Sequence, residues 1–141
     1  MLKPECIKYF PKTLKNVILP PNLVAALIDE YMYDLWPTQL EELCLRNASE
    51  ITGACLMCLP RTIKYLYIPD MKQVVDSDLA FLPPCLMLLD LSAATELTEH
   101  GISLLPTTLE TIILRNTPIR DFSVFKRFGS LKFKELSIKQ A

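Results

Sequence analysis

The residues that could carry out chemistry in this chain are few and far apart. Cys55 and Cys58 form a C-x-x-C pair, the spacing found in zinc sites and in disulfide-exchange centres. A structural zinc site needs about four ligands, whereas the sequence offers no second C-x-x-C pair and a single histidine, His100. We therefore interpret Cys55 and Cys58 as structural thiols, and we expect neither a metal nor a cofactor.

The same histidine is the candidate for acid–base catalysis. His100 directly follows Glu99, and no serine or cysteine is spaced to act as its nucleophile. Three glycines in 141 residues leave no glycine-rich loop that could cradle a phosphate. The sequence therefore favours a solvent-facing histidine and a protein that is not an enzyme.

A repeated pair of residues indicates which elements position these side chains. A large apolar residue followed by a proline or glycine recurs at intervals of 23 residues. The pairs are Trp36-Pro37, Leu59-Pro60, Leu82-Pro83, Leu105-Pro106 and Phe128-Gly129, with Phe10-Pro11 placed 26 residues before the first of them. A fixed period of this length is typical of proteins built from stacked structural repeats.

Each pair is followed by an apolar triplet with the spacing L-x-x-L-x-L. Alternation over its last two positions predicts a short strand whose apolar side chains enter the core. The triplets are Leu14/Val17/Leu19, Leu40/Leu43/Leu45, Ile63/Leu66/Ile68, Leu86/Leu89/Leu91, Leu109/Ile112/Leu114 and, one residue late, Phe133/Leu136/Ile138. Leu66 and Leu89 are thus expected between neighbouring units, where an introduced charge would unfold the domain.

The second half of each unit has helical spacing. The apolar residues at helix-like offsets are Ile51/Cys55/Leu56/Leu59, Val74/Leu79/Leu82 and Leu97/Ile102/Leu105. Thr52, Asp76 and Thr98 stand where a short helix needs a cap or an early acidic residue. Stacked units of strand, loop and short helix predict an α/β fold: a short, right-handed, curved solenoid. We expect a concave parallel sheet of about six strands, with the short helices on the convex side.

This frame resembles the leucine-rich repeat family, and it is closest to the cysteine-containing and ribonuclease-inhibitor-like subclasses. Units of those subclasses run L-x-x-L-x-L, then a Cys or Asn, then I-T-D-x-G-L-x-x-L. Residues 86–105 follow this pattern, with Leu97-Thr98-Glu99-His100-Gly101-Ile102 in place of I-T-D-x-G-L, and residues 40–59 also fit. The Cys or Asn position departs from the family, since it holds Ala48, Met71, Ala94 and Thr117, and Asn47 and Asn116 lie one residue earlier. The resemblance covers roughly residues 10–139 and implies a leucine-rich-repeat solenoid.

We expect a single domain over residues 1–141. Residues 1–36 would form an N-terminal cap and an atypical first repeat, residues 37–128 four 23-residue repeats, and residues 129–141 a terminal strand. Residues 20–36 carry the longest helical pattern. We interpret that pattern as a repeat helix with one extra turn in preference to a docking helix.

The residues between the buried positions of each triplet are expected to point outward onto the concave face. Aromatic side chains near arginine are typical of interface centres, although strand surfaces also collect Tyr and Ile for their own packing. The predicted partner-binding residues are Cys44, Arg46, Tyr65, Tyr67, Leu88, Asp90, Ile113 and Arg115.

The last predicted strand forms a second candidate surface. No helix pattern follows Ile138, and an uncovered parallel edge strand invites pairing. Lys132, Lys134 and Lys139 could guard this edge by charge, or a partner or a second copy could cover it. The residues of this candidate docking edge are Phe133, Glu135, Ser137 and Lys139.

Composition and charge exclude several classes of partner. Fifteen basic against sixteen acidic residues give a net charge of −1, with no excess to attract nucleic acid or an anionic membrane. No apolar run approaches the ~18 residues of a membrane-spanning helix. The first residues lack the apolar core of a secretory signal, and the five cysteines follow no secreted-scaffold spacing. We therefore expect an intracellular protein whose partners are proteins, located in the cytoplasm, with an organelle as the alternative.

Three functions remain open at this point. The expected function is a non-catalytic interaction module that binds a protein partner through its concave strand face. The first alternative is a structural subunit of a larger multiprotein assembly, docked or dimerised through the edge of the terminal strand. The family resemblance suggests a second alternative, a substrate-receptor-like adaptor of a ubiquitin ligase.

Overall fold

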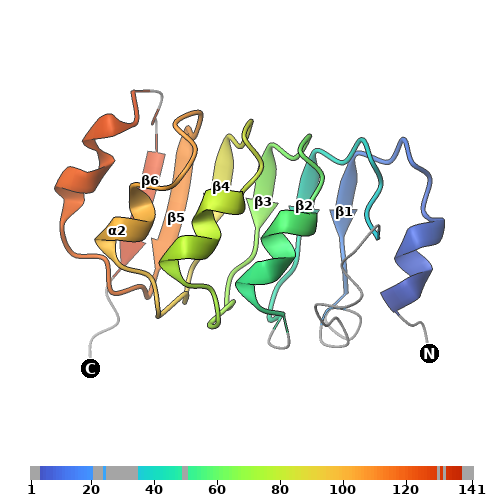
Figure 1. Ribbon diagram of the computed structural model, residues 1–141, viewed down its shortest axis with the longest axis horizontal. Helices are drawn as coiled ribbons and strands as arrows, with labels where there is room; N and C mark the ends of the chain where they lie inside the picture. The colour runs from blue at the N-terminus through green and yellow to red at the C-terminus, as the bar shows by residue number, and fades with distance from the viewer. Residues whose placement is uncertain are drawn as a thin grey trace.

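Short strands and short helices alternate along the chain (Figure 1). The computed structural model describes residues 4–20, 24, 35–48, 51–129, 131 and 133–137. Within these residues the six strands are β1 (Asn16–Ile18), β2 (Glu42–Cys44), β3 (Tyr65–Tyr67), β4 (Leu88–Asp90), β5 (Thr111–Arg115) and β6 (Phe133–Ser137). They form one sheet in sequence order, and every neighbouring pair is parallel. The predicted α/β class with a parallel sheet is confirmed.

The register of the sheet follows the 23-residue period. The second residues of β2 to β5 lie opposite one another and are fully buried: Leu43, Leu66, Leu89 and Ile112. The burial expected for Leu66 and Leu89 is therefore confirmed, and burying one such side chain stabilises the fold by about 1.5–3 kcal/mol. Just before the strands, the backbone N–H groups of Lys64 and Tyr65 both donate to the carbonyl oxygen of Glu41, at 2.8 and 3.0 Å. The apolar rows and the backbone bonds thus fix the same register.

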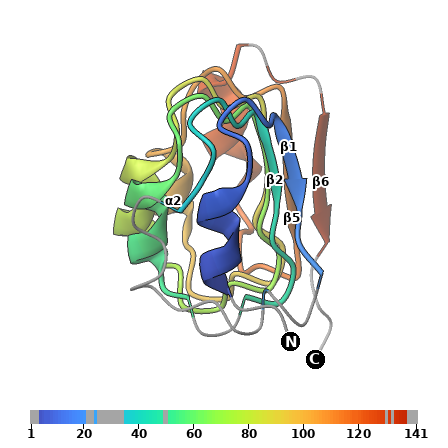
Figure 2. The same ribbon diagram turned by 90° about the vertical axis from the view of Figure 1, so that its right-hand side faces the viewer.

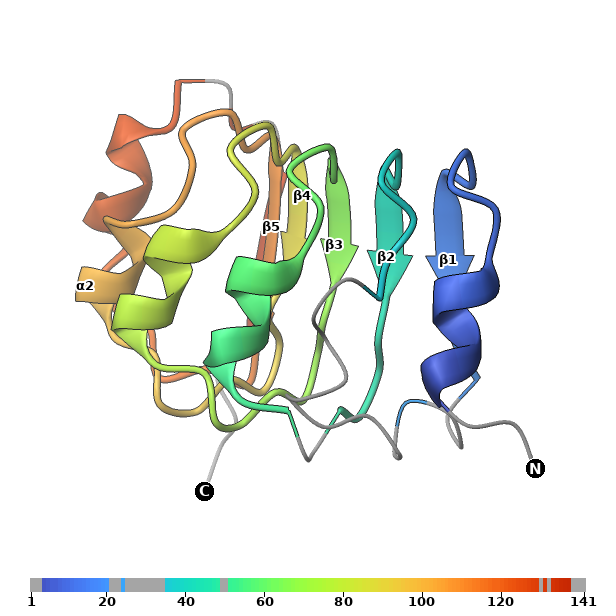
Figure 3. The same cartoon turned by 45° about the vertical axis from the view of Figure 1, so that its right-hand side comes forward.

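The helices between the strands are short. They are η1 (Pro4–Tyr9), η3 (Gly53–Cys58), η4 (Asp76–Phe81), α2 (Glu99–Ile102) and η5 (Phe122–Arg127), and all but α2 are 3₁₀ helices. Figure 2 shows η3, η4 and α2 on one side of the sheet, and Figure 3 shows the row of strands behind them. The apolar residues expected on this side, Ile51, Leu56, Val74, Leu79, Leu97 and Ile102, are all buried. The helices therefore cover one face of the sheet and leave the other face open.

The predicted helix starts are confirmed, with one difference at η4. Thr52 and Thr98 accept hydrogen bonds through their hydroxyl oxygens from the backbone N–H groups of Ala54 and His100, each at 3.3 Å. Asp76 lies in the first turn of η4, and its carboxylate accepts from the backbone N–H of Thr98, one unit later, at 2.8 Å. Asp76 is thus the early acidic residue of its own helix and a link to the next unit.

One residue in each unit adopts the left-handed backbone conformation shortly after the strand. These residues recur every 23 positions: Asn47 (φ 61°), Asp70 (φ 69°), Ala93 (φ 65°) and Asn116 (φ 59°). The residues that follow them, at the position where the resembled family has Cys or Asn, are all buried: Ala48, Met71, Ala94 and Thr117. Asparagine tolerates the left-handed region better than most residues. Asn47 and Asn116 therefore serve the backbone turn rather than a buried side-chain ladder.

The expected helix over residues 20–36 lies mostly outside the described residues. Within that segment, Val24 is helical and buried, and Leu35 and Trp36 are buried. In the part of the chain that the structure covers, no helix has the length and apolar character needed to cross a bilayer.

Candidate protein-binding surface

The open side of the sheet is lined by two rows of side chains. In β2 to β5 the residues on either side of the buried second residue point away from the helices, because side chains alternate along a strand. The register aligns the first row as Glu42, Tyr65, Leu88 and Thr111, and the second as Cys44, Tyr67, Asp90 and Ile113. We call these eight residues the strand face. It contains six of the eight residues that the sequence predicts for partner binding.

The centre of the strand face is shielded by its own neighbours. Cys44 and Asp90, which flank Tyr67 in the second row, are only 8 % and 7 % exposed. Tyr65, Tyr67 and Leu88 are partly buried. Strands lie about 4.8 Å apart, so the tyrosine side chains of β3 are the cross-strand neighbours of these shorter side chains.

Tyr67 lies in a partly desolvated and acidic environment. Burial raises the pKa of its hydroxyl above the ordinary value of 10.0, and nearby Glu42, Cys44 and Asp90 raise that pKa further. Asp90 lies directly opposite Tyr67 on β4, and Glu42 lies on β2, on the other side of β3. Asp90 is therefore the direct neighbour of Tyr67, whereas Glu42 lies opposite Tyr65 and reaches Tyr67 through its charge.

Asp90 is a buried carboxylate held by a short turn. Its Oδ1 accepts a hydrogen bond from the backbone N–H of Ser92 at 3.0 Å. The hydroxyl oxygen of Ser92 in turn accepts from the backbone N–H of Arg115, at 3.1 Å. These bonds fix the direction of the Asp90 side chain but supply no cation to balance its charge.

The two predicted arginines lie at the rim of this surface. Arg46 follows β2 and Arg115 ends β5, and both side chains are exposed. They occupy equivalent positions three units apart, with β3 and β4 between their strands. The structure therefore brings Cys44, Tyr67, Asp90 and Ile113 together in one row, but it does not bring the arginines to the centre.

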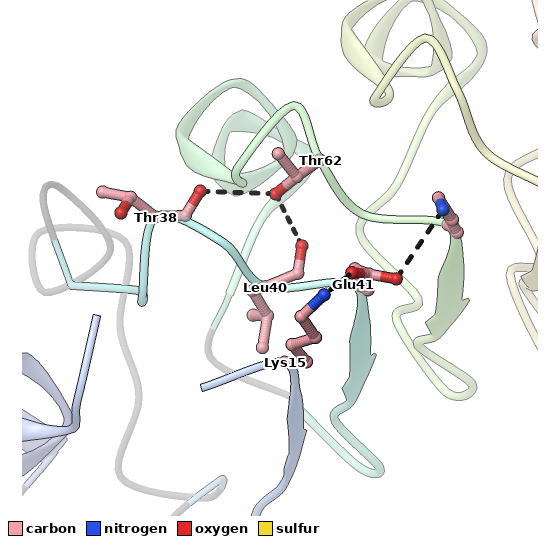
Figure 4. A network of polar contacts seen from close by, with 6 residues as sticks. Lys15, Thr38, Leu40, Glu41 and Thr62 are labelled. Atoms are coloured by element: carbon pink, nitrogen blue, oxygen red, sulfur yellow. Dashed lines mark hydrogen bonds and ion pairs between the residues drawn. The ribbon is translucent and has the colours of Figure 1, made fainter. Parts of the chain in front are cut away.

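At the opposite ends of the strands, basic residues pair with Glu41. The Nζ of Lys15 lies 2.8 Å from Glu41 Oε2 (Figure 4), and the Nζ of Lys64 lies 3.7 Å from Glu41 Oε1. The hydrogen bond from Lys15 lowers the pKa of Glu41 below its usual 4.5, and the same bond raises the pKa of Lys15. Exposed pairs of this kind add little stability. Their consequence here is that these lysines are engaged by Glu41, away from the carboxylates of the strand face.

Sequence reasoning left Glu42 out of the binding residues. Glu42 lies opposite Tyr65 and close enough to Tyr67 to affect its titration. The sequence contained the information needed to include it, because Glu42 occupies the same position in its repeat as Tyr65 and Leu88 occupy in theirs.

The second candidate surface lies on β6. This strand pairs with β5 in a register that is shifted by two residues from the one that the triplet pattern predicts. The triplet pattern places Leu136 in the row of Ile112, whereas Leu136 lies opposite Leu114 and Lys134 lies opposite Ile112. A shift of two residues keeps every side chain on the same face of the sheet, so alternation alone does not distinguish the two registers. The observed partners of Phe133, Glu135 and Ser137 are Thr111, Ile113 and Arg115. Lys139 lies outside the described residues, as do Lys132 and Ile138.

The residues first considered for chemistry are dispersed. Cys55 is 2 % exposed in η3, Cys58 is partly buried, and His100 is exposed on α2, as the sequence predicts. Among the residues that the structure describes, no three His, Cys, Asp or Glu side chains are grouped so that they could hold a metal ion.

Comparison with known proteins adds no functional assignment. No protein-family model matches this chain, and no curated protein sequence matches it.

Proposed function

We propose that this chain is a leucine-rich-repeat solenoid that binds a protein partner through its strand face. Support for the fold comes from three features with one period: the buried strand centres, the left-handed residues and the short helices. Each unit leaves an apolar side that only a neighbouring unit covers, which is the principle of a repeat solenoid.

The observation that carries the proposed function is the centre of the strand face. Tyr65, Tyr67 and Leu88 form a partly buried apolar group beside the carboxylates of Glu42 and Asp90. Tyrosine is enriched at the energetic centres of protein interfaces because it combines a large apolar area with a polar group. The helix side also exposes apolar residues, among them Met57 and Phe81, exposed by 57 % and 42 %, and Val75, exposed by 41 %.

The test is a pull-down of the tagged protein from its native cells, quantified by mass spectrometry. Wild type is compared with the double variant Tyr65→Ala/Tyr67→Asp. A matched control on the helix side, Met57→Ala/Phe81→Asp, changes two exposed residues by the same chemistry. Circular dichroism establishes that both variants are folded. We expect partners that are lost from the strand-face variant and retained by the control.

A second candidate function, a structural subunit of a larger assembly, is favoured by the edge of β6. In the described sheet β6 pairs with β5 alone, so its other edge is open to a further strand. Stoichiometric partners retained by both double variants would support this function over strand-face binding. Recovery of ubiquitin-ligase subunits would support the adaptor role.

A further inference from the structure

The charges on the strand face are unbalanced. Its eight residues include two carboxylates, Glu42 and Asp90, and no basic side chain. In the described part of the chain, ion pairs join Lys15 and Lys64 to Glu41, and neither Glu42 nor Asp90 takes part in one. Asp90 is 7 % exposed as a residue, and among the described residues its carboxylate accepts a hydrogen bond from Ser92 and takes part in no ion pair, so a cation that reaches it meets an unbalanced charge.

The aromatic ring beside Asp90 favours the same kind of ligand. Tyr67 lies on β3 directly opposite Asp90 on β4, and Glu42 lies on β2 opposite Tyr65, two residues before Tyr67 on β3. The face of a tyrosine ring attracts ammonium and guanidinium groups, most strongly where water is partly excluded. Tyr65 and Leu88, in the neighbouring row, supply apolar surface beside this position.

We propose that the strand face binds a linear polypeptide segment that places a Lys or Arg side chain over Tyr67 and beside Asp90, with an adjacent apolar residue against Tyr65 and Leu88. The inference rests on the proposed function, because it names the chemistry of the partner that the strand face would bind. Arg46 and Arg115, exposed at the rim, disfavour additional basic residues at that end of the segment. The surface thus selects a basic side chain at its centre and neutral or acidic ones towards that rim.

The experiment selects a display library of random linear peptides on the immobilised protein. Peptides that also bind a Tyr65→Ala/Tyr67→Ala variant, which removes both rings and adds no charge, are discarded, so that the remaining ones depend on the strand face. Their affinities are then measured by fluorescence polarisation for wild type, Asp90→Asn and Glu42→Gln. Asparagine at position 90 keeps an oxygen to accept from Ser92, so this variant retains the turn that holds the side chain. Glu96→Gln, an exposed acidic residue in the loop after β4, is the control for loss of one charge.

We expect peptides enriched in Lys or Arg next to an apolar residue, with affinity for Asp90→Asn weaker by about 10- to 100-fold, the loss typical of a charge-assisted hydrogen bond. Glu96→Gln should bind like wild type. The inference would be overturned if the strand-face peptides lacked a basic residue, or if they bound Asp90→Asn with the same affinity as wild type. Either result would leave the proposed function standing. A library that yields no strand-face peptide would also overturn it, whereas the pull-down decides the proposed function separately.

Discussion

The hydroxyl of Thr62 donates a 2.6 Å hydrogen bond to the carbonyl oxygen of Leu40, one unit earlier in the chain (Figure 4). Thr108 makes the equivalent bond to the carbonyl oxygen of Leu86, at 2.7 Å. Cys85 stands midway between the two threonines, 23 residues from each, and its side chain is exposed. The two threonines thus join neighbouring units through a hydroxyl, and at the position midway between them a thiol, a weak hydrogen-bond donor, stands in its place.

Replacing this thiol by a hydroxyl should stabilise the protein. In Cys85→Thr the new hydroxyl would reach the carbonyl oxygen of Ile63, which is equivalent to Leu40 and Leu86. We expect the free energy of unfolding to rise by about 1 kcal/mol, the net value of a typical hydrogen bond, as measured by urea denaturation. The reverse change, Thr62→Cys, should lower it by a similar amount. If Thr62→Cys destabilises and Cys85→Thr has no effect, the units joined at Cys85 differ in geometry from the others.

The 23-residue period of the sequence predicts the positions of the strands well, but it does not predict the backbone conformation of the turns. The triplets predict the positions of β1 to β5 and the burial of Leu43, Leu66 and Leu89, because these features follow directly from a fixed repeat. The left-handed residues were not predicted, because a single backbone conformation depends on how the loop closes and leaves no periodic apolar signal.

The candidate site was predicted in its positions but not in its electrostatics. Alternation and period together place Tyr65, Tyr67, Leu88 and Asp90 on one face of the sheet. The shielding of Asp90 and the influence of Glu42 on Tyr67 depend on the size and orientation of neighbouring side chains. The predicted register of β6 was wrong because a two-residue shift leaves the pattern of faces unchanged.

Ala93 adopts a strained backbone conformation in its turn, and a residue that tolerates this conformation should make the protein more stable. It adopts the left-handed conformation with φ 65°, where a residue other than Gly, Asn or Asp costs about 1–2 kcal/mol. Its backbone N–H donates to the carbonyl oxygen of Arg115 at 2.7 Å, which holds it there. Ala93→Asn should therefore raise the free energy of unfolding by about 0.5–1 kcal/mol, measured by thermal and urea denaturation. Asn116→Ala, the opposite change at the equivalent position, should lower the free energy of unfolding. If both changes shifted the free energy of unfolding in the same direction, the left-handed φ would not be the cause.

Gly101 is required by the close approach of Asp76 from the preceding unit. A Cβ on Gly101 would lie 3.1 Å from Asp76 Cγ and 3.2 Å from Leu79 Cδ1, and nearer still to Asp76 Oδ1. Asp76 has little freedom to move away, because the backbone N–H and the hydroxyl of Thr98 both donate to its carboxylate. We expect Gly101→Ala to lower the free energy of unfolding by about 1–3 kcal/mol.

A double-mutant cycle separates this steric effect from a loss of backbone freedom. In the Asp76→Ala background the contacts with the Asp76 carboxylate are gone and the contact with Leu79 Cδ1 remains, so adding Gly101→Ala should cost less than it does in wild type. Gly129→Ala is the matched control, because no atom lies within 4 Å of the place that a methyl group would take there. Additive effects of Gly101→Ala and Asp76→Ala in urea denaturation would rule out the close contact as the cause.

Glu99 links α2 to the next unit and makes that link sensitive to acid. Its Oε1 accepts hydrogen bonds from the backbone N–H groups of Arg120 and Asp121, at 2.7 and 3.1 Å, and these bonds lower the pKa of Glu99 below its usual 4.5. Because the unfolded chain then binds the proton more readily than the folded one, this contribution to stability is complete above pH 4.5. It is lost as the pH falls through the lower pKa of the folded state.

Glu99→Gln should therefore be less stable than wild type near neutral pH, and the difference should shrink in acid. The measurement compares urea midpoints of the two proteins at about pH 7 and about pH 3, which bracket the titration of a glutamate. Glu96→Gln removes one acidic charge from the loop that precedes α2 and controls for the change in net charge. A Glu99→Gln deficit of the same size at both pH values would show that the carboxylate charge contributes nothing to the link. Equal stability of the two proteins near neutral pH would show instead that the oxygen acceptor alone, which glutamine retains, makes the link.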